Sequence, residues 1–513
     1  MKQLAYVLEK IFGVIFLVFA AGLVVCSFHG GSGFEHNVLW YISRIIVILF
    51  FTGAVYCALN LPKCITGKEG YRNIVSIFVI SLCVHLLVVW VVGAYTEQVS
   101  DFGFAFAFSE KSFPLAEAPD QYRIMSNWAI YPLYLKFIQE LFGYGDLTGV
   151  ICNAVLCAFS SALIYVLCYM GLNNENIGYL AALIYTFWPS HLLYSVVLSP
   201  EFVNIFLTLL FLLLIETVIR KYKEKTACIM ICLSAVVLSL SGFFKRTDKI
   251  ILVALSIMLV LFVIKTACLQ SLKKGMIGGG GKVCKKLLVL LFICIYLLSN
   301  KLIFAGLDYA YGEAVNRDPT MHFIYVGLNP QTYGTWNKES GGIYTQNVQN
   351  CDYDYKKASK LTLEQLKEEI KEKKYLTPVY FERKFEVAWE NNGETYWVNE
   401  TISDASPILK KPNWFYAVNT LTQNFWMMTC IFVCMEAAFL LFRSDSRRMF
   451  SCLFLFGFAC LMFLSEVQER YKCVMYPIIS ILAADGIVHF VGVLNLIFGK
   501  GKQYICSVSE VFK

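Results

Sequence analysis

Asp101 is the first residue of this chain whose type and position suggest chemistry. It follows the third long apolar segment and stands just before Phe102, Phe104, Phe106 and Phe108. A carboxylate at a membrane–water boundary, beside an apolar surface, can act as a general base on a substrate held at that interface. The alternative is a solvated acid at the end of a helix. The charged groups that share its membrane face decide between the two interpretations.

Three more turns between apolar segments carry charged residues whose chemistry could serve a reaction. Glu201 begins the sixth segment, Lys245 and Arg246 lie between the seventh and eighth, and Arg470 lies between the eleventh and twelfth. The planar guanidinium group of arginine is well suited to hold a phosphate, although such an arginine can also extend toward lipid headgroups. A lipid phosphate held beside carboxylates is the arrangement expected for sugar transfer from a membrane-bound carrier.

The composition is that of an integral membrane protein. Hydrophobic residues make up 58% of the 513 residues, and charged residues only 16%. Apolar segments of about 18 to 25 residues, long enough to cross the hydrocarbon core as helices, recur along the chain. They lie at 5–27, 39–61, 73–95, 147–170, 176–198, 202–220, 227–244, 249–269, 286–306, 421–442, 449–465 and 472–497. We therefore predict an all-α polytopic membrane protein of about 12 transmembrane helices.

The distribution of lysine and arginine predicts the orientation of these helices. When the twelve segments alternate from an inside N-terminus, most cationic clusters fall inside, as the positive-inside tendency requires. The clusters comprise Lys63, Lys68, Arg72, Arg220, Lys221, Lys223, Lys225, Lys273, Lys274, Lys282, Lys285, Lys286, Arg443, Arg447, Arg448, Lys500 and Lys502. Both termini are then cytoplasmic, and the net charge of +7 reflects orientation rather than nucleic-acid binding. Asp101, Glu201, Arg246 and Arg470 fall on the outer face, where the two arginines contradict the tendency.

Two long segments fall on the same outer face. The first, 96–146, contains an amphipathic stretch at 128–138 that predicts a helix lying on the membrane surface. The second, 307–413, predicts a smaller extracytoplasmic subdomain, α-rich or α/β, with one helix capped by Thr362 and another opened by Thr377 before a proline. The predicted parts of the chain are two extra N-terminal helices (1–72), a transmembrane core with the first outer loop (73–306), the subdomain (307–413), and C-terminal helices with a short cytoplasmic tail (414–513).

No metal-binding or nucleotide-binding pattern accompanies these features. The 19 cysteines are scattered mainly through apolar segments, and Cys351 has no local partner in the polar segment around it. Neither a zinc site nor a disulfide framework is expected. The glycine-rich stretch 275–282 lacks the spacing of a phosphate-binding loop and is typical of a flexible basic linker. We expect no cofactor. A divalent cation is left open as an alternative, although no ligand spacing in the sequence indicates one.

In their order and spacing, several of these stretches resemble a known family. They are Ser100-Asp101-Phe102, Trp188-Pro189 through Tyr194, Ser199-Pro200-Glu201, Phe244-Lys245-Arg246, the stretch from His322 to Asn329, and Gln468-Glu469-Arg470-Tyr471 with Pro477. Over about residues 73 to 495 the chain resembles bacterial GT-C glycosyltransferases of the family 39-like group, which includes protein mannosyltransferases and aminoarabinose transferases.

The resemblance implies a GT-C type transmembrane bundle and an inverting transfer of a sugar from a polyprenyl-phosphate carrier to an acceptor outside the cytoplasm. The implied catalytic residues are Asp101, as the general base, and Glu201, which helps to position donor or acceptor. The implied donor-phosphate-binding residues are Lys245, Arg246 and Arg470. Further substrate contacts are implied for Tyr194, His322, Glu469 and Tyr471. Stabilising the charge of the departing phosphate would lower the barrier directly.

The chain departs from the family pattern in two ways. Two extra helices precede the expected core, and Phe102 follows Asp101 where many relatives have a second acid. Four other acids are therefore alternatives to Glu201 as the second carboxylate. They are Glu97, Glu110, Glu117 and Asp120.

Two other functions fit parts of the sequence. A transporter or flippase for a lipid-linked glycan would place charges inside the bundle near the membrane midplane and use discontinuous helices. A non-catalytic assembly factor or receptor would bind its partner through 307–413 and tolerate the loss of Asp101. The resemblance favours a bacterial plasma membrane, and it leaves the sugar and the acceptor (a protein, a cell-surface glycan or a lipid) open.

Overall fold

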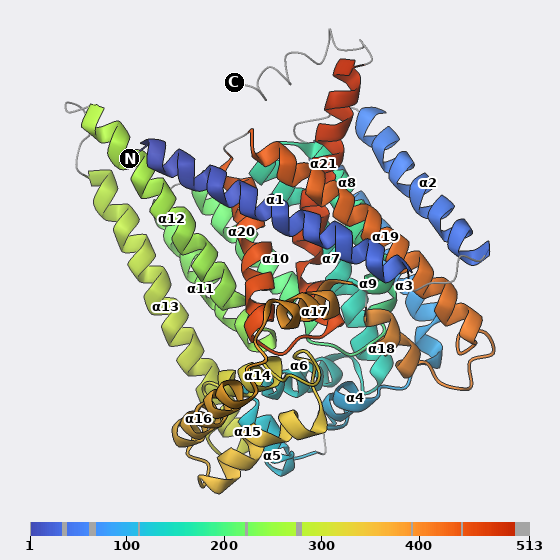
Figure 1. Cartoon of the computed structure of the whole chain (residues 1–513), viewed down its shortest axis with the longest axis vertical. Helices are drawn as coiled ribbons and strands as arrows, with labels where there is room; N and C mark the ends of the chain where they lie inside the picture. Colours follow the sequence, from blue (N-terminus) through green and yellow to red (C-terminus); the bar gives the residue numbers. More distant parts are fainter. Residues whose placement is uncertain are drawn as a thin grey trace.

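The chain is helical throughout the part that the structure describes (Figure 1). The computed structural model describes residues 2–32, 38–60, 68–110, 113–220, 224–272, 280–390, 393–442 and 445–497. Within these ranges there is no strand, and β-type pairing is confined to an isolated bridge between Thr96 and Ile402. Of the two alternatives predicted for 307–413, the α-rich one agrees with the described residues.

Ten helices of the described part are long and apolar enough to cross a membrane. They are α1 (Lys2–Ser32), α2 (Val38–Asn60), α3 (Lys68–Val91), α7 (Asp146–Leu172), α10 (Glu201–Arg220), α11 (Glu224–Phe244), α13 (Gly280–Tyr311), α19 (Pro412–Leu440), α20 (Ser446–Leu464) and α21 (Tyr476–Ile497). Large apolar side chains such as Leu49 and Leu302 are exposed on them, as lipid-facing helices require. The prediction of an all-α polytopic membrane protein is confirmed at this level.

Two of the twelve predicted spans are not among these ten helices. The span predicted at 176–198 is instead two helices, α8 (Glu175–Thr186) and α9 (Pro189–Tyr194). Pro189 has no backbone N–H and disfavours a helical conformation at the residue before it, so the helix ends and a new one begins at the proline. The span predicted at 249–269 falls on α12 (Thr247–Leu272), whose side chains beyond residue 261 lie outside the described part.

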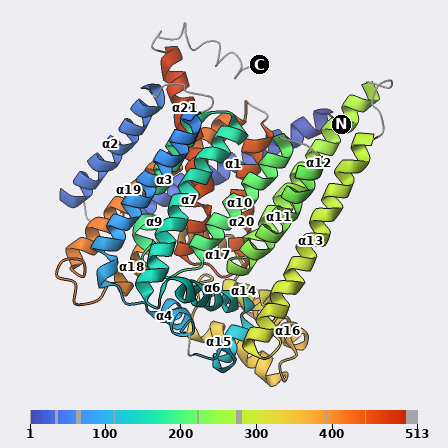
Figure 2. The same cartoon turned by 180° about the vertical axis from the view of Figure 1, so that it is seen from behind.

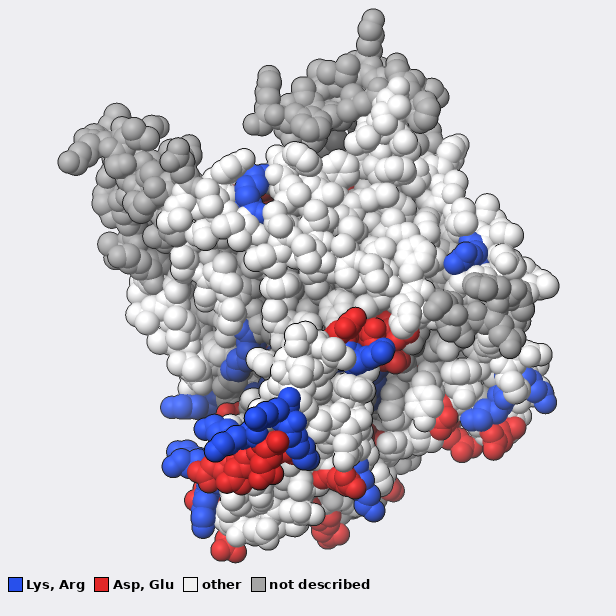
Figure 3. Space-filling model, viewed as in Figure 1, with Lys and Arg blue, Asp and Glu red and all other residues white. Residues whose placement is uncertain are grey.

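Most of the short helices gather at one end of the long ones, which we call the cavity end (Figures 1 and 2). They are η1 (Gly93–Tyr95), α4 (Ser100–Ala107), η2 (Leu115–Glu117), α5 (Asp120–Ile124), α6 (Ser126–Phe142), α14 (Thr320–Gly327), α15 (Lys338–Asn350), α16 (Tyr355–Lys373), α17 (Pro378–Trp389), α18 (Glu394–Thr401) and η3 (Glu469–Met475). On the face drawn in Figure 3, charged side chains crowd this end, whereas the described surface over the long helices is almost free of them. That uncharged band is suited to the lipid interior.

The two ends of the chain pack together in the bundle. Helix α1 lies along α19 and also touches α17 and α20, and α2 packs against α19 and α8 (Figure 1). The ring of Phe19 meets that of Trp389 edge-on at 5.8 Å between centroids. Gly486 lets α21 approach α19 closely, because a Cβ atom at this position would collide with the carbonyl oxygen of Phe432. The predicted N-terminal and C-terminal parts are therefore in direct contact.

Local predictions at the cavity end have mixed outcomes. The stretch 128–138 lies within helix α6, and Thr377 caps α17 by accepting a hydrogen bond from the backbone N–H of Tyr380, as expected.

The predicted cap at Thr362 is wrong. Helix α16 begins earlier, where Asp354 accepts from two backbone N–H groups, and Thr362 is buried in its middle. Asp101 also does not end the third span: it lies in the first turn of α4.

Candidate functional site

Hydrogen bonds of the Gln98 side chain and a close approach at Gly103 hold helix α4 against the turn that precedes Glu201. The side chain of Gln98 donates to the carbonyl of Val196 at 3.0 Å and accepts from the N–H of Leu198 at 2.8 Å. A Cβ atom on Gly103 would lie 2.6 Å from the Gln98 carbonyl oxygen, so only glycine permits this close approach. The sequence around Asp101 thus sets its position relative to the start of α10.

A cavity of about 750 Å³ opens beside Asp101 at the cavity end. Its walls come from α4, α5, α6, the start of α10, the turn at 244–245, helices α14, α15 and α18, and the segment 466–471. Six of the nine predicted site residues line it. They are Asp101, Glu201, Lys245, His322, Arg470 and Tyr471. Residues far apart in the sequence therefore meet at one place of the size of a ligand-binding site.

Glu201 and Lys245 form an ion pair in the cavity floor. Their charged atoms lie 2.7 Å apart, and Glu201 is only 1% exposed. The hydroxyl of Ser199 donates to the other carboxylate oxygen of Glu201, and the buried Tyr194 donates to Ser199 at 3.1 Å. The ammonium group of Lys245 also stands 4.6 Å from the centre of the Tyr471 ring. Glu201 is thereby compensated and held in one position.

Arg470 is a buried cation without a carboxylate partner among the described residues. Its guanidinium carbon lies 4.9 Å from the ring centre of Phe102, 4.6 Å from that of Trp397 and 5.7 Å from that of Tyr471. Its Nε donates to Gln468 at 2.8 Å, while neither Nη group has a hydrogen-bond partner in the described chain. Aromatic rings attract a cation but do not neutralise it. Two guanidinium nitrogens therefore remain for an anionic ligand in the cavity.

Asp101 is an acid of the cavity that, like Arg470, has no partner of opposite charge among the described residues. Its side chain is exposed, and it makes no hydrogen bond or ion pair with any other described residue. Phe102, the next residue along α4, is buried against Arg470, so the unpaired acid and the unpaired cation stand on adjoining parts of one wall. This arrangement offers a proton acceptor and an anion-binding group to one bound molecule.

Glu466 is a cavity residue that the sequence analysis did not assign to the site. It is 5% exposed and accepts hydrogen bonds from the Tyr471 hydroxyl and the Gln468 amide, both at 2.8 Å. Burial raises the pKa of its carboxyl group above the ordinary value. Its place in the same turn as Arg470 was the available signal, but a turn position does not reveal which side chains point inward.

A buried lysine fixes this turn to the short helices. Lys384 of α17 is 1% exposed and donates to the carbonyl groups of Gly327 and Ser465, the latter at 2.9 Å. Burial lowers the pKa of its ammonium group to about 7. The backbone N–H of Glu466 also bonds to the carbonyl of Phe323 at 2.7 Å. Helices α14 and α17 therefore hold the turn that carries Glu466 and Arg470.

His322 belongs to the wall formed by α14 and α15. It is 3% exposed, and neither of its ring nitrogens has a hydrogen-bond partner in the described chain. Burial lowers the pKa of the imidazole to about 4, so the ring is neutral near pH 7. A neutral imidazole has one donor and one acceptor nitrogen, and both are buried here.

Three predicted site residues do not line the cavity. Arg246 is not in the lining, its guanidinium carbon lies 6.0 Å from the ring centre of Phe243, and Lys245 is the charged residue that this turn contributes to the cavity. Tyr194 lies behind Glu201 and acts through Ser199. Glu469 packs against the backbone at Gly393, where an added Cβ atom would lie 2.7 Å from it. Among the alternative acids for the second carboxylate, Glu97, Glu110, Glu117 and Asp120 are likewise absent from the lining.

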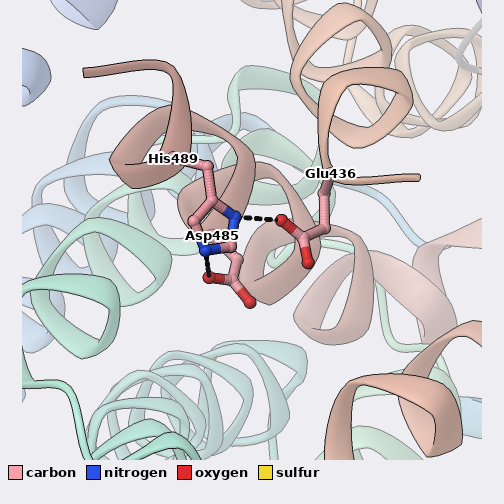
Figure 4. A group of neighbouring side chains, drawn as sticks. All are labelled: Glu436, Asp485 and His489. Atoms are coloured by element: carbon pink, nitrogen blue, oxygen red, sulfur yellow. Dashed lines mark hydrogen bonds and ion pairs between the residues drawn. The ribbon is translucent and has the colours of Figure 1, made fainter. Parts of the chain in front are cut away.

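A second group of charged residues lies near the end of α19 and the start of α20, away from the cavity, and Figure 4 shows three of its side chains. The imidazole of His489 stands between two carboxylates, with Nδ1 at 2.5 Å from Glu436 and Nε2 at 3.6 Å from Asp485. Arg448 donates to both oxygens of Asp485, at 2.5 and 3.1 Å, and lies 3.7 Å from Glu436. The three side chains in Figure 4 have ligand atoms close enough to share a metal ion. Arg448 already supplies the positive charge there, so an ion-paired network explains the group.

Comparison of the chain with protein-family models, with curated proteins and with solved structures finds no match. A function for the cavity must therefore be argued from its own chemistry and from the sequence resemblance.

Proposed function

We propose that the protein is a membrane glycosyltransferase that moves a sugar from a polyprenyl-phosphate carrier to an acceptor outside the cytoplasm. The observation that carries this proposal is the unpaired Asp101 facing the same cavity as the unpaired Arg470. A transferase of this kind needs a base for the acceptor hydroxyl and a cation for the departing phosphate, and it needs both at the membrane boundary.

In the proposed reaction, the acceptor oxygen attacks the anomeric carbon of the sugar as Asp101 takes the hydroxyl proton. The bond between that carbon and the phosphate oxygen breaks, and its electron pair leaves with the polyprenyl phosphate. Arg470 stabilises the charge that develops on this leaving group, and Lys245 adds positive potential from its pair with Glu201. Attack from the face opposite the phosphate inverts the anomeric configuration, as the resemblance implies.

Placement in the membrane follows from the same proposal. The cavity end faces the outside, where a lipid-linked donor is presented, and both termini lie in the cytoplasm. Among the described cations, Arg220, Arg447 and Arg448 lie at helix ends opposite the cavity, in agreement with the positive-inside tendency. The clusters at Lys63, at Lys221 and Lys223, at Lys273 and Lys274, at Arg443 and at the C-terminus lie outside the described residues. A bacterial plasma membrane is the proposed location.

Transport of a lipid-linked glycan is the second candidate, because two observations favour it. The break between α8 and α9 is a discontinuous helix, and the Glu436 group is a buried charge cluster in the bundle. Asp485 of this cluster lies midway along α21, but the cluster is not at the middle of its other two helices. Arg448 lies in the first turn of α20, and Glu436 lies in the last two turns of α19, so both are near the membrane boundary.

A proteoliposome experiment separates transfer from transport. Purified full-length protein is supplied with a panel of polyprenyl phosphates carrying radiolabelled hexoses or pentoses, together with a membrane extract from the source cells as acceptor. The proposal predicts release of polyprenyl phosphate together with a labelled product. Movement of intact donor across the bilayer without release would favour transport, and a panel covering the sugars of the source envelope without any release would contradict the enzyme.

The non-catalytic alternative is separated by one variant in the same experiment. An assembly factor that binds through helices α14 to α18 does not need a carboxylate at position 101, so Asp101→Asn would behave as wild type. The transferase requires that the variant lose product formation while its fold and its affinity for donor remain. Equal turnover in both proteins would move the base to another acid.

A further inference from the structure

The cavity has two walls of different chemistry. The floor carries most of the charged residues, whereas the wall contributed by α6, α14, α15 and the loop before α15 presents Trp128, His322, Trp336, Thr345 and Gln346 beside the cation Lys338. These five side chains are uncharged near pH 7: two indoles, a neutral imidazole, a hydroxyl and an amide. We call them the neutral wall. Its chemistry does not suit a phosphate, which the cationic floor serves.

Within the neutral wall, the side chain of His322 has no hydrogen-bond partner among the described residues. A buried polar group without a hydrogen bond is costly, so both ring nitrogens of His322 require a partner from outside the described chain. Because the neutral ring has one donor and one acceptor, a hydroxyl-rich molecule satisfies it better than a purely anionic or a purely apolar one. The neighbouring rings of Phe323 and Tyr344 fix the imidazole, with centroids 5.1 and 6.3 Å away.

Trp336 supplies the apolar surface beside these polar groups. Its side chain is 52% exposed while lining the cavity, which is unusual for a tryptophan not covered by anything. Its indole lies against α15 at Gly341, where a Cβ atom would collide with the ring nitrogen. Glycine at this position therefore lets the indole lie close against the helix. A fixed, exposed indole presents a π-face on which the C–H face of a sugar ring can stack.

We infer that the neutral wall is a saccharide-binding subsite and that the acceptor of the reaction is a glycan. The role as acceptor rests on the proposed transferase activity, whereas saccharide binding itself does not. A sugar ring stacks on Trp336, and its hydroxyl groups exchange hydrogen bonds with His322, Gln346 and Thr345. The hydroxyl that reacts then extends toward Asp101, which lines the same cavity.

The described wall is less suited to a protein acceptor. Extended peptides are commonly bound by addition to a strand edge or by clusters of charged groups. The described residues of the wall lie in helices or in the loop before α15 and offer no strand edge, and Lys338 is the sole charged residue that α15 contributes to the lining. With a polypeptide, hydrogen bonding to the two nitrogens of His322 would depend on the side chain that the peptide places there.

The test measures binding of free saccharides without any donor. Full-length protein in lipid nanodiscs is titrated with linear tetrasaccharides of mannose, of glucose and of N-acetylglucosamine, and with a serine- and threonine-rich peptide. Affinity is followed by saturation-transfer NMR and calorimetry. We compare wild type with Trp336→Ala and His322→Gln. The matched control is Trp90→Ala, since Trp90 is 75% exposed on α3 and is not in the lining.

The inference predicts that at least one tetrasaccharide binds wild type and the Trp90→Ala variant equally. Trp336→Ala weakens that binding tenfold or more, and His322→Gln weakens it about threefold to tenfold. If no tetrasaccharide binds wild type, or if Trp336→Ala leaves the affinity unchanged, the inference is wrong. Binding of the peptide alone, lost in Trp336→Ala, would assign the wall to a protein acceptor instead.

Failure of this inference is separate from failure of the proposed function. Saccharide binding is measured without donor or turnover, so a negative result leaves release of polyprenyl phosphate to be observed or not in its own experiment. Conversely, saccharide binding at Trp336 without any release of polyprenyl phosphate would support the saccharide subsite and contradict the transferase activity.

Discussion

Charged residues are used in two different ways at the two ends of this bundle. In the group of Glu436, Asp485, His489 and Arg448, each carboxylate has the guanidinium of Arg448 within 3.7 Å. In the cavity, Glu201 and Lys245 pair in the same manner, but Asp101 and Arg470 have no ionic partner among the described residues. The first group is closed on itself, whereas the second is open to a ligand.

The difference separates structural from functional charge. A buried pair satisfies its own electrostatics and is strongly destabilised when one member is removed. An unpaired cation held between aromatic rings, beside an unpaired acid in a cavity, gains stability from a bound partner instead. Removing a charge should therefore reduce stability at the opposite end and reduce activity at the cavity end.

The largest expected effect is on activity, at Asp101. Loss of a general base slows a reaction by about 10²–10⁴-fold, so Asp101→Asn should reduce product formation by that factor. Because the side chain is exposed and unpaired, the melting temperature should change little. Initial rates and a thermal melt of the same preparation check both halves. A variant that melts early as well as reacting slowly would place Asp101 among the structural charges.

Asp485→Asn should show the opposite pattern. The substitution leaves Arg448 without its bidentate partner in the bundle, and we expect a loss of about 3 kcal/mol of stability. The rate per folded molecule should stay within about twofold of wild type, because the group is remote from the cavity. Thermal unfolding in detergent, combined with rates normalised to folded protein, tests this. An unchanged melting temperature with lost activity would reverse the assignment.

His322 should make stability depend on pH. Its folded pKa of about 4 lies below the ordinary value of 6.5, so the unfolded chain binds more protons between these values. The stability that comes from the neutral ring is present above about pH 6.5 and is lost as the pH falls toward 4. At pH 5 the loss is about 2 kcal/mol. His322→Gln should remove this part of the difference between melts at pH 7 and pH 5, and an identical pH dependence in both proteins would contradict the burial of a neutral imidazole.

The smallest expected effect concerns the placement of Asp101. In Gly103→Ala the new methyl group meets the Gln98 carbonyl at 2.6 Å, so α4 must shift. We expect about tenfold slower product formation, equivalent to about 1.4 kcal/mol. Gly53→Ala is the matched control, because a Cβ atom on Gly53 meets nothing within 4 Å. Equal rates in the two variants would show that the register of α4 does not matter.

Much of the architecture could be predicted from the sequence, because a membrane demands long apolar helices wherever the chain crosses it. Glu201 at the start of α10 was visible in the same way, as the first polar residue before an apolar run. The break at Pro189 was harder to see, since apolar residues continue on both sides of the short stretch from Pro189 to His191. Helix α16 was misplaced at its start because Thr362 resembles a cap as well as Asp354 does, and only packing distinguishes them.

The site itself was only partly predictable for a different reason. Lys245 and Arg246 are adjacent in one turn, and the sequence does not show that only Lys245 faces the cavity. Likewise Glu466 and Trp336 come from segments that form part of one cavity only when α14, α15 and the turn before η3 pack together. The pairing state of Asp101 and Arg470, on which the proposed function depends, is a property of the tertiary structure alone.

One measurement tests the account most directly: release of polyprenyl phosphate per folded molecule, for Arg470→Met and Asp485→Asn beside wild type. Methionine fills the space between the aromatic rings without the charge. The account predicts that Arg470→Met is slower by about 10²–10³-fold, as when a charge-stabilising donor is removed, while Asp485→Asn stays within about twofold of wild type. Equal release by Arg470→Met and wild type, or a greater loss in Asp485→Asn, would contradict the claim that the open charges of the cavity carry the chemistry.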